Sequence, residues 1–201
     1  MLMIENYQEF KNFLNIQNKE KKLLLHACCA PCASYTLELL NSHFNITIFF
    51  YNPNIMPDSE FEFRYQELLR LIELMKLDIT VIKGDLDTSF TELSKGLEME
   101  KEGGKRCYSC YYSRLAATAK FAKENDFDFF TTTLSISPYK NSKWINEIGY
   151  RLEKEYQINF LYSDFKKEEG YKKSIELSKK YNLYRQNYCG CVFSKRGLKN
   201  D

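Results

Sequence analysis

The sequence predicts one α/β domain, in which a parallel β-sheet is covered by helices. A length of 201 residues suits a single domain, and 44% hydrophobic residues are enough to build a core. Short apolar runs alternate with helical patterns along the chain, which is typical of a parallel sheet with crossover helices. The first apolar run, residues 23–27, is too apolar for an edge strand and is expected inside the sheet.

The elements follow in the order of these patterns. An amphipathic helix is predicted at residues 5–17, within an appended N-terminal element of residues 1–20. Apolar runs predict strands at residues 23–27, 46–51, 79–82, 127–132 and 160–162. Helical spacing predicts helices at residues 33–42, 58–76, 90–97, 107–123, 144–156 and 171–181. Residues 134–141 are expected to form a polar loop, and residues 183–198 end the chain.

Charge and composition narrow the class of protein. The N-terminus lacks the apolar core of a secretory signal and no membrane span is present, so a cytoplasmic location is expected. Seven cysteines in that compartment indicate metal or redox chemistry rather than a disulfide framework. The C-terminal segment, residues 164–201, carries ten Lys/Arg against five Asp/Glu. This segment is either an electrostatic surface for RNA or a solvated lysine-rich helix.

Three cysteines lie in the sequence His26-Ala27-Cys28-Cys29-Ala30-Pro31-Cys32. This stretch follows the first predicted strand, and ligands of open α/β sheets bind at that strand's carboxyl end. A free cysteine is often only a small buried hydrophobe. Two adjacent cysteines point in different directions, however, so they cannot both fill one face of a core. The cluster therefore predicts a metal or redox site.

Two further cysteine pairs follow. Cys107 and Cys110 form a C-x2-C pair at a helix start, where both sulfurs lie on one face, as in zinc, iron–sulfur and thioredoxin-like sites. Cys189 and Cys191 flank Gly190, and a disulfide in so small a ring is strained and easily reduced. They are a switching dithiol or two more metal ligands. Four thiolates for a [4Fe–4S] cluster, a redox pair and one spare, Cys32, fit the count of seven.

Further motifs accompany the cysteines between about residues 22 and 198. They are Tyr51-Asn52-Pro53-Asn54-Ile55 with Glu60 and Arg64, Arg106-Cys107-Tyr108-Ser109-Cys110 with Arg114 and Leu115, Thr132-Thr133-Leu134 with Ser137-Pro138-Tyr139-Lys140, Asp164-Phe165-Lys166-Lys167 with Gly170-Tyr171, and Tyr184-Arg185-Gln186-Asn187-Tyr188-Cys189-Gly190-Cys191. Together with the first cysteine group they resemble the QueH-type epoxyqueuosine reductases.

The resemblance implies a HUP-like α/β fold related to the PP-loop ATPases, and the two-electron reduction of epoxyqueuosine to queuosine at the tRNA wobble position. It implies that the ligands of a [4Fe–4S] cluster are Cys28, Cys29, Cys107 and Cys110. It makes Cys189 and Cys191 the redox pair. Some family members carry aspartate in place of Cys32, where an additional iron has been associated, so the role of Cys32 stays open.

The remaining site predictions concern protons, substrate and partners. His26 is a candidate proton donor or a structural group beside the metal. The residues predicted to bind substrate are Asn52, Asn54, Arg114, Tyr184, Arg185 and Gln186. The partners are a tRNA bearing epoxyqueuosine in its anticodon loop and an electron donor that the sequence does not identify, with no membrane partner.

Three competing functions remain from the residues alone. A PP-loop enzyme that uses ATP needs a glycine- and serine-rich phosphate loop after the first strand, where this chain has Cys-Cys-Ala-Pro-Cys. A zinc-stabilised RNA-binding module would be colourless, whereas an iron–sulfur protein is brown. A thiol–disulfide oxidoreductase acting on proteins would need neither a cluster nor a basic surface for RNA.

Overall fold

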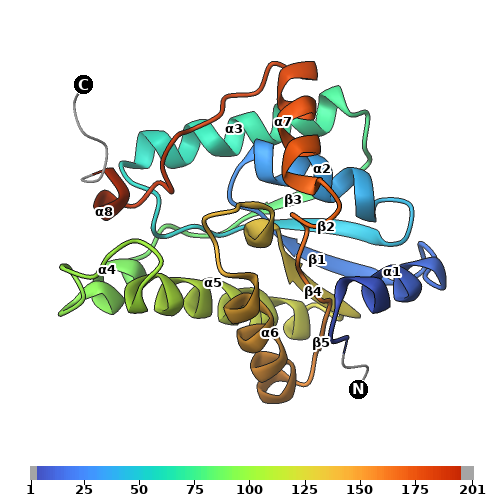
Figure 1. Ribbon diagram of the computed structural model, residues 1–201, viewed down its shortest axis with the longest axis horizontal. Helices are drawn as coiled ribbons and strands as arrows, with labels where there is room; N and C mark the ends of the chain where they lie inside the picture. The colour runs from blue at the N-terminus through green and yellow to red at the C-terminus, as the bar shows by residue number, and fades with distance from the viewer. Residues whose placement is uncertain (1–3, 196–201) are drawn as a thin grey trace.

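The structure is a computed structural model, and it describes residues 4–195. A five-stranded parallel sheet with the order β3-β2-β1-β4-β5 forms its centre (Figure 1). The strands are β1 (Lys22–His26), β2 (Asn45–Phe50), β3 (Thr80–Lys83), β4 (Phe129–Thr132) and β5 (Asn159–Phe160). The predicted parallel α/β sheet, with its first strand in the interior, is therefore confirmed.

Strand β1 is apolar without interruption because both of its faces are buried. Leu23 and Leu25 belong to one hydrophobic core and Leu24 to the other, and all three side chains are fully buried. Parallel sheets covered on both faces produce this pattern. Two separate cores therefore hold the helices on opposite sides of the sheet.

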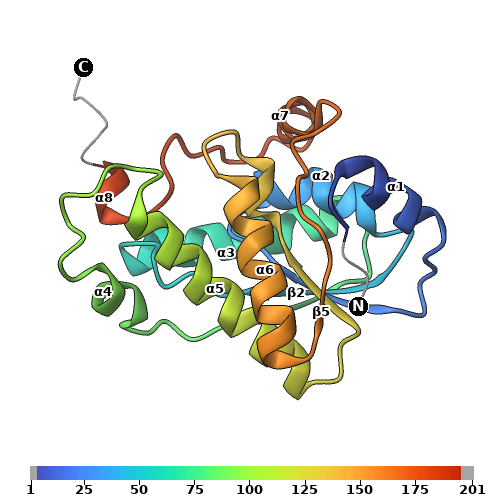
Figure 2. The same ribbon diagram turned by 60° about the horizontal axis from the view of Figure 1, so that its bottom comes forward.

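The helices divide between these two cores. Their bounds are α1 (Tyr7–Asn15), α2 (Ala30–Leu40), α3 (Asp58–Leu74), α4 (Ser89–Ser94), α5 (Lys105–Glu124), α6 (Ser142–Tyr156), α7 (Gly170–Lys180) and α8 (Val192–Lys195), with a 3₁₀ turn η1 (Thr133–Ile136). Helices α1, α2, α3 and α7 contribute to the core of Leu23, and α5 and α6 to the core of Leu24. Figure 2 shows α5 and α6 together on their face of the sheet. No helix in residues 4–195 is long and apolar enough to cross a membrane.

Three elements differ locally from the sequence prediction. Helix α2 begins at Ala30, within the cysteine loop, because Pro31 in the first turn needs no backbone N–H partner. Cys32 consequently lies on the helix rather than in the loop. Residues 133–136 form the buried turn η1 instead of a polar loop, with the Thr132 side chain accepting from the Leu134 N–H at 3.1 Å. Near the chain end, α8 is a helix that the pattern did not predict.

The predicted segments at the two ends are described only in part. Within the N-terminal element of residues 1–20, residues 1–3 lie outside the described part, and α1 packs into a core through Phe10 and Leu14. Residues 196–201 of the basic C-terminal segment likewise lie outside it.

The strand order reverses between β1 and β4, which are neighbours in the sheet. The chain passes from β1 into α2 on one face, and it enters and leaves β4 through α5 and α6 on the other. Such a reversal opens a crevice at the carboxyl ends of the strands, where ligands bind in open α/β folds. The fold therefore places Cys28 and its neighbours at the edge where a ligand site is expected.

Candidate functional site

A cavity of about 710 Å³ lies at this edge of the sheet, within the usual range for small-molecule sites. Its walls come from segments that are distant in the sequence. The lining residues are Cys28, Pro31, Cys32, Glu102, Ile136, Ser137, Tyr139, Lys140, Tyr171, Ser174, Arg185, Gln186, Asn187, Tyr188, Cys189 and Ser194. Two of the three predicted cysteine groups thus contribute to one cavity.

Cys28, Cys29 and Cys32 converge at the start of α2. Their sulfur atoms all lie within 4.8 Å of one another, and the Sγ atoms of Cys28 and Cys29 are 3.8 Å apart. Hydrogen bonds from Cys29 and Cys32 hold the pKa of Cys28 well below its usual range, and the same interactions raise the pKa of Cys32. The arrangement therefore favours a thiolate at Cys28, which is the form that binds metal.

Cys107 and Cys110 lie in the first two turns of α5. The Cys107 sulfur accepts the Gly103 N–H at 3.2 Å, and Cys110 packs against Cys191 and Phe90. Burial raises the pKa of both thiols, that of Cys110 to about 11. Their sulfurs are not part of the 4.8 Å group of Cys28, which is the one such group of metal-ligating side chains in residues 4–195.

The Cys189-Gly190-Cys191 segment lies between these two groups. All three residues are described, and both thiols are free. A hydrogen bond from Cys191 holds the pKa of Cys189 well below its usual range, with further help from Lys140 and Arg114. The Cys189 charge in turn acts on Cys28, Cys107 and Cys110, all of which lie within its electrostatic reach. Cys189 is therefore the sulfur that connects the cysteine groups.

Arg114 is a buried cation beneath the cysteines. Its side chain is 1% exposed, donates to the Asn52 Oδ1 and interacts with the Cys110 thiol. Asn52 in turn donates to the carbonyl of Ala27 at 2.9 Å, which ties this arrangement to the end of β1. No carboxylate pairs with Arg114 among the described residues.

His26 ends β1 directly below the cysteine loop. Its Nε2 lies 3.0 Å from the Tyr51 carbonyl oxygen and 3.3 Å from the Arg114 Nε, and its Nδ1 lies 2.8 Å from the Thr132 hydroxyl. Burial, with the charge of Arg114, lowers the pKa of His26 to about 3, so the ring is neutral. Both nitrogens are used within the protein, and His26 does not line the cavity.

Lys140 brings a further positive charge to the cavity wall. Burial by itself would lower the pKa of its ammonium, but the charges of Cys189, Cys28 and Cys32 raise the pKa above its usual range. Arg114 is a buried cation without a carboxylate partner among the described residues, and such a charge is costly unless another anion compensates it. Thiol donors grouped beside Arg114 and Lys140 therefore fit an anionic metal–thiolate centre.

The predicted substrate-binding residues occupy two different places. Arg185 and Gln186 line the cavity. Asn52, Asn54 and Arg114 are at most 1% exposed and lie behind the cysteine loops. Tyr184 is 37% exposed and is not among the residues that line the cavity.

Sequence reasoning had assigned no role to Lys140, Glu102 or Tyr139, all of which line the cavity. The available signal for Tyr139 and Lys140 was their place in the motif Ser137-Pro138-Tyr139-Lys140.

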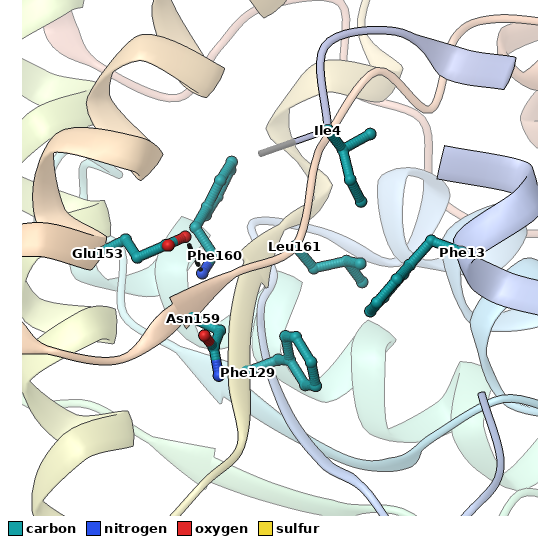
Figure 3. Close-up of a pocket in the computed structure, with 7 residues that line it drawn as sticks. All are labelled: Ile4, Phe13, Phe129, Glu153, Asn159, Phe160 and Leu161. Carbon is teal, nitrogen blue, oxygen red and sulfur yellow. Dashed lines mark hydrogen bonds between the residues drawn. The ribbon is translucent and has the colours of Figure 1, made fainter. Parts of the chain in front are cut away.

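A second cavity lies at the opposite ends of β4 and β5 (Figure 3). Its volume is about 20 Å³, and it is lined mainly by apolar side chains, including Ile4, Phe13 and Leu161. Glu153 on its wall accepts the Phe160 N–H at 2.9 Å. A space of this size holds about one water molecule, so it is a packing feature and not a ligand site.

Comparisons with known proteins identify close relatives. The sequence model of the family "Epoxyqueuosine reductase QueH" matches residues 23–197. The chain is 42% identical over 180 residues to the epoxyqueuosine reductase QueH of Staphylococcus aureus, covering 86% of this chain and 75% of that protein. It is 41% identical over 186 residues to the QueH of Staphylococcus epidermidis, covering 88% and 78%.

A solved structure shows the same fold. It is the U34-tRNA thiolase NcsA of Methanococcus maripaludis with its [4Fe–4S] cluster, matched with a TM-score of 0.59 and 13% identity over 93% of this chain and 66% of that one. At that identity the likeness concerns the fold alone, and it agrees with the HUP-like, PP-loop-related sheet that the sequence predicts.

Proposed function

Because the chain belongs to the epoxyqueuosine reductase QueH family, we propose that the cavity beside Cys28, Cys32 and Cys189 is its active site. The enzyme is an oxidoreductase that reduces epoxyqueuosine to queuosine at the wobble position of tRNA. The single observation that carries the proposal is the convergence of cysteines from two distant segments on one cavity of about 710 Å³.

The proposed cofactor is a [4Fe–4S] cluster held by Cys28, Cys29, Cys107 and Cys110. Cys28 and Cys29 directly precede α2, and Cys107 and Cys110 lie in the first two turns of α5. The buried Arg114 interacts electrostatically with both groups, through Cys28 and Cys110. When bound, such a cluster supplies electrons one at a time.

An additional iron near Cys32 is the finer part of this proposal. Cys32 lies within 4.8 Å of Cys28 and Cys29 but is not one of the four proposed cluster ligands, so its thiol would be available to a further metal ion.

The proposed redox pair is Cys189 and Cys191. Removal of the epoxide oxygen as water consumes two electrons and two protons and leaves a carbon–carbon double bond. Oxidation of the two thiols to a disulfide releases two electrons and two protons, so the balance closes without a further reactant in that turnover. An electron donor then reduces the disulfide for the next turnover. The interaction between the two sulfurs supports this pairing.

The chain's polar side chains orient the substrate within the proposed site. Arg185 and Gln186 offer hydrogen-bonding groups on the cavity wall, and Lys140 offers a positive charge to an oxygen that becomes negative as its bond to carbon breaks. His26 stays a candidate proton donor, although its buried position better suits a structural role.

The tRNA binds at the mouth of the cavity in this proposal. Tyr139 lines the cavity and is 79% exposed, so it can stack on a base of the unpaired anticodon loop. A cytoplasmic location, where tRNA is modified, is supported by seven free thiols. The electron donor is a partner whose chemistry is that of a low-potential reductant.

The test is anaerobic purification followed by single-turnover and multiple-turnover assays on tRNA carrying epoxyqueuosine. Iron and sulfide are counted first, and the nucleosides are then separated and identified by mass. We expect iron with sulfide, and conversion of epoxyqueuosine to queuosine with dithionite as reductant. Zinc without sulfide would favour an RNA-binding module, and thiol exchange on proteins without a cluster would favour an oxidoreductase of other specificity. Conversion that depends on ATP would favour a PP-loop enzyme.

A further inference from the structure

Arg64 is a buried residue of α3 that the proposed function leaves without a role. Its side chain is 1% exposed, although arginine is almost never fully buried unless it is paired. Its Nε donates to the Glu60 carboxylate at 2.7 Å, one helical turn earlier. Its Nη1 donates to the carbonyl of Cys189 at 3.1 Å, and the guanidinium lies 5.2 Å from the centre of the Tyr188 ring. Arg64 thus joins α3 to the segment that carries the redox pair.

The third nitrogen of the guanidinium, Nη2, is buried and has no hydrogen-bond partner among the described atoms. Leaving a buried charged donor without a partner is costly. The groups that interact electrostatically with this guanidinium include the thiols of Cys29 and Cys28 as well as Glu60. The buried charge of Arg64 therefore acts on sulfurs that become more negative when they bind metal.

The backbone beside Arg64 leaves space for its guanidinium at Gly190. Gly190 has a φ of +112°, and a Cβ there would lie 3.1 Å from the Arg64 Nη1 and 3.0 Å from Ile55 Cγ1. The Gly190 carbonyl accepts the Met56 N–H at 3.0 Å, so the loop is fastened on both sides of the guanidinium. The chain can pass this close to the Arg64 guanidinium because residue 190 is a glycine, which indicates a specific contact between the two.

We propose that Arg64 is a positioning residue that sets the reduction potential of the metal centre held through Cys29. Its buried positive charge acts on the Cys29 thiolate, while its Nη1 keeps Cys189 beside the centre. Hydrogen bonds and positive charge next to ligating sulfurs stabilise the more negative, reduced state and so raise the potential. The inference rests on the proposed function, because it requires the metal centre to be bound there.

The same helix supplies a matched control. Arg70, also on α3, pairs with Glu67 at 2.7 Å and donates to the backbone carbonyls of Tyr181 and Asn182. It therefore makes the same kinds of contact with an acidic neighbour and with the C-terminal part of the chain. Its side chain is 39% exposed and no cysteine is among its partners. Replacement of Arg70 therefore tests the effect of losing a contact between α3 and the C-terminal part of the chain, and it leaves the charge beside the sulfurs unchanged.

The experiment compares the parent enzyme with Arg64→Gln, Arg64→Lys and Arg70→Gln, all purified anaerobically. Iron and sulfide are counted, and the potential is measured by redox titration followed by electron paramagnetic resonance. We expect a more negative midpoint potential in Arg64→Gln and an intermediate one in Arg64→Lys, which keeps the charge but cannot bond to both the Glu60 carboxylate and the Cys189 carbonyl as the guanidinium does. Arg70→Gln is expected to match the parent.

The experiment distinguishes failure of the proposed function from failure of the inference about Arg64. A parent enzyme without iron and sulfide overturns the proposed function. A parent enzyme that holds the centre, together with an unchanged potential in Arg64→Gln, overturns only the role of Arg64. If Arg64→Gln does not take up iron, Arg64→Lys decides, and a potential equal to that of the parent then refutes the inference.

Discussion

The proposed active-site cavity has two walls of different construction. The inner wall, which includes Cys28 and Cys32, lies at the end of β1. Behind it, His26, Asn52, Arg114 and Thr132 form a continuous buried hydrogen-bonded arrangement. The outer wall is the segment of residues 185–189 and Ser194, which joins the body mainly through isolated contacts such as that of Arg64 with Cys189.

This difference separates two tasks. A wall anchored in a sheet holds its side chains at fixed positions, which suits metal ligands. A wall held by a few side-chain contacts opens at lower free energy than the core does, which suits a pair of thiols whose bonding changes during turnover. The comparison therefore supports the proposal that the inner wall with α5 binds the cofactor and that the outer wall undergoes redox cycling.

The largest expected effect is the loss of a metal ligand from α5. Cys107→Ala removes a thiolate that no neighbouring group replaces, so we expect the anaerobic protein to lose its colour, its iron and its activity. Iron and sulfide analysis checks this. Ser109→Ala, in the same helical turn, is the control and should keep the full iron content. Unchanged iron in Cys107→Ala would remove Cys107 from the ligand set.

A substitution in the outer wall is expected to abolish multiple turnover without removing the metal centre. Cys189→Ser should keep the iron content and the cluster spectrum but stop after at most one turnover, because the electrons stored in the thiol pair are no longer available. Labelling of free thiols after one turnover without reductant, followed by peptide mass analysis, should show Cys189 and Cys191 joined. Both thiols labelled as free, or iron lost from Cys189→Ser, would break the division between the two walls.

A smaller effect is expected from Gly190→Ala. A residue with a side chain at a φ of +112° is strained by about 2 kcal/mol, and its Cβ would also press on Ile55 and Arg64. We expect the thermal midpoint to fall by roughly 4–8 °C and turnover to slow, while the iron stays bound.

Gly96→Ala is the matched control for this substitution. Gly96 has a φ of +76° but nothing within 4 Å of its would-be Cβ, so the substitution adds backbone strain without a contact at the site. We expect it to lower the thermal midpoint without slowing turnover. Equal turnover in the two variants would show that the Gly190 contacts do not matter for the reaction.

The sequence predicts the elements around the inner wall only in part. Alternating apolar runs and the cysteine spacings locate β1, β4 and the start of α5, because strand burial and helix periodicity are local properties of the chain. The start of α2 at Ala30 and the burial of η1 depend on packing between distant segments and are not visible in the pattern.

The positions of charged side chains show the same limit. Arg114 is predicted from its motif to contact substrate, and its burial among Asn52, His26 and Cys110 follows only from the folded arrangement. Lys140 acquires its role as a cavity cation because the sheet reversal brings residue 140 opposite Cys189. Neither environment is encoded by the residues next to it in the sequence.

The smallest effect is expected on the surface of α7, which leads away from the outer wall. Its first turn includes Tyr171, a cavity-lining residue, and it carries four lysines, Lys172, Lys173, Lys179 and Lys180. If they contact tRNA phosphates, the logarithm of affinity falls with the logarithm of salt concentration by about 0.7 for each contact to a single strand. Replacing all four with Gln should weaken binding at low salt and flatten this slope, measured by fluorescence anisotropy with an anticodon stem-loop.

Position along α7 makes this prediction sharper. Lys172 and Lys173 lie next to the cavity-lining Tyr171, whereas Lys179 and Lys180 lie about two turns farther along the helix. An RNA whose wobble nucleotide enters the cavity must pass nearer to the first pair, so Lys172→Gln with Lys173→Gln should flatten the slope more than Lys179→Gln with Lys180→Gln. Iron content should be unchanged in both, because neither pair contacts the inner wall. Equal affinity and an equal salt slope in the fourfold variant would make these lysines a solvated face, and the tRNA would then have to reach the cavity from another side.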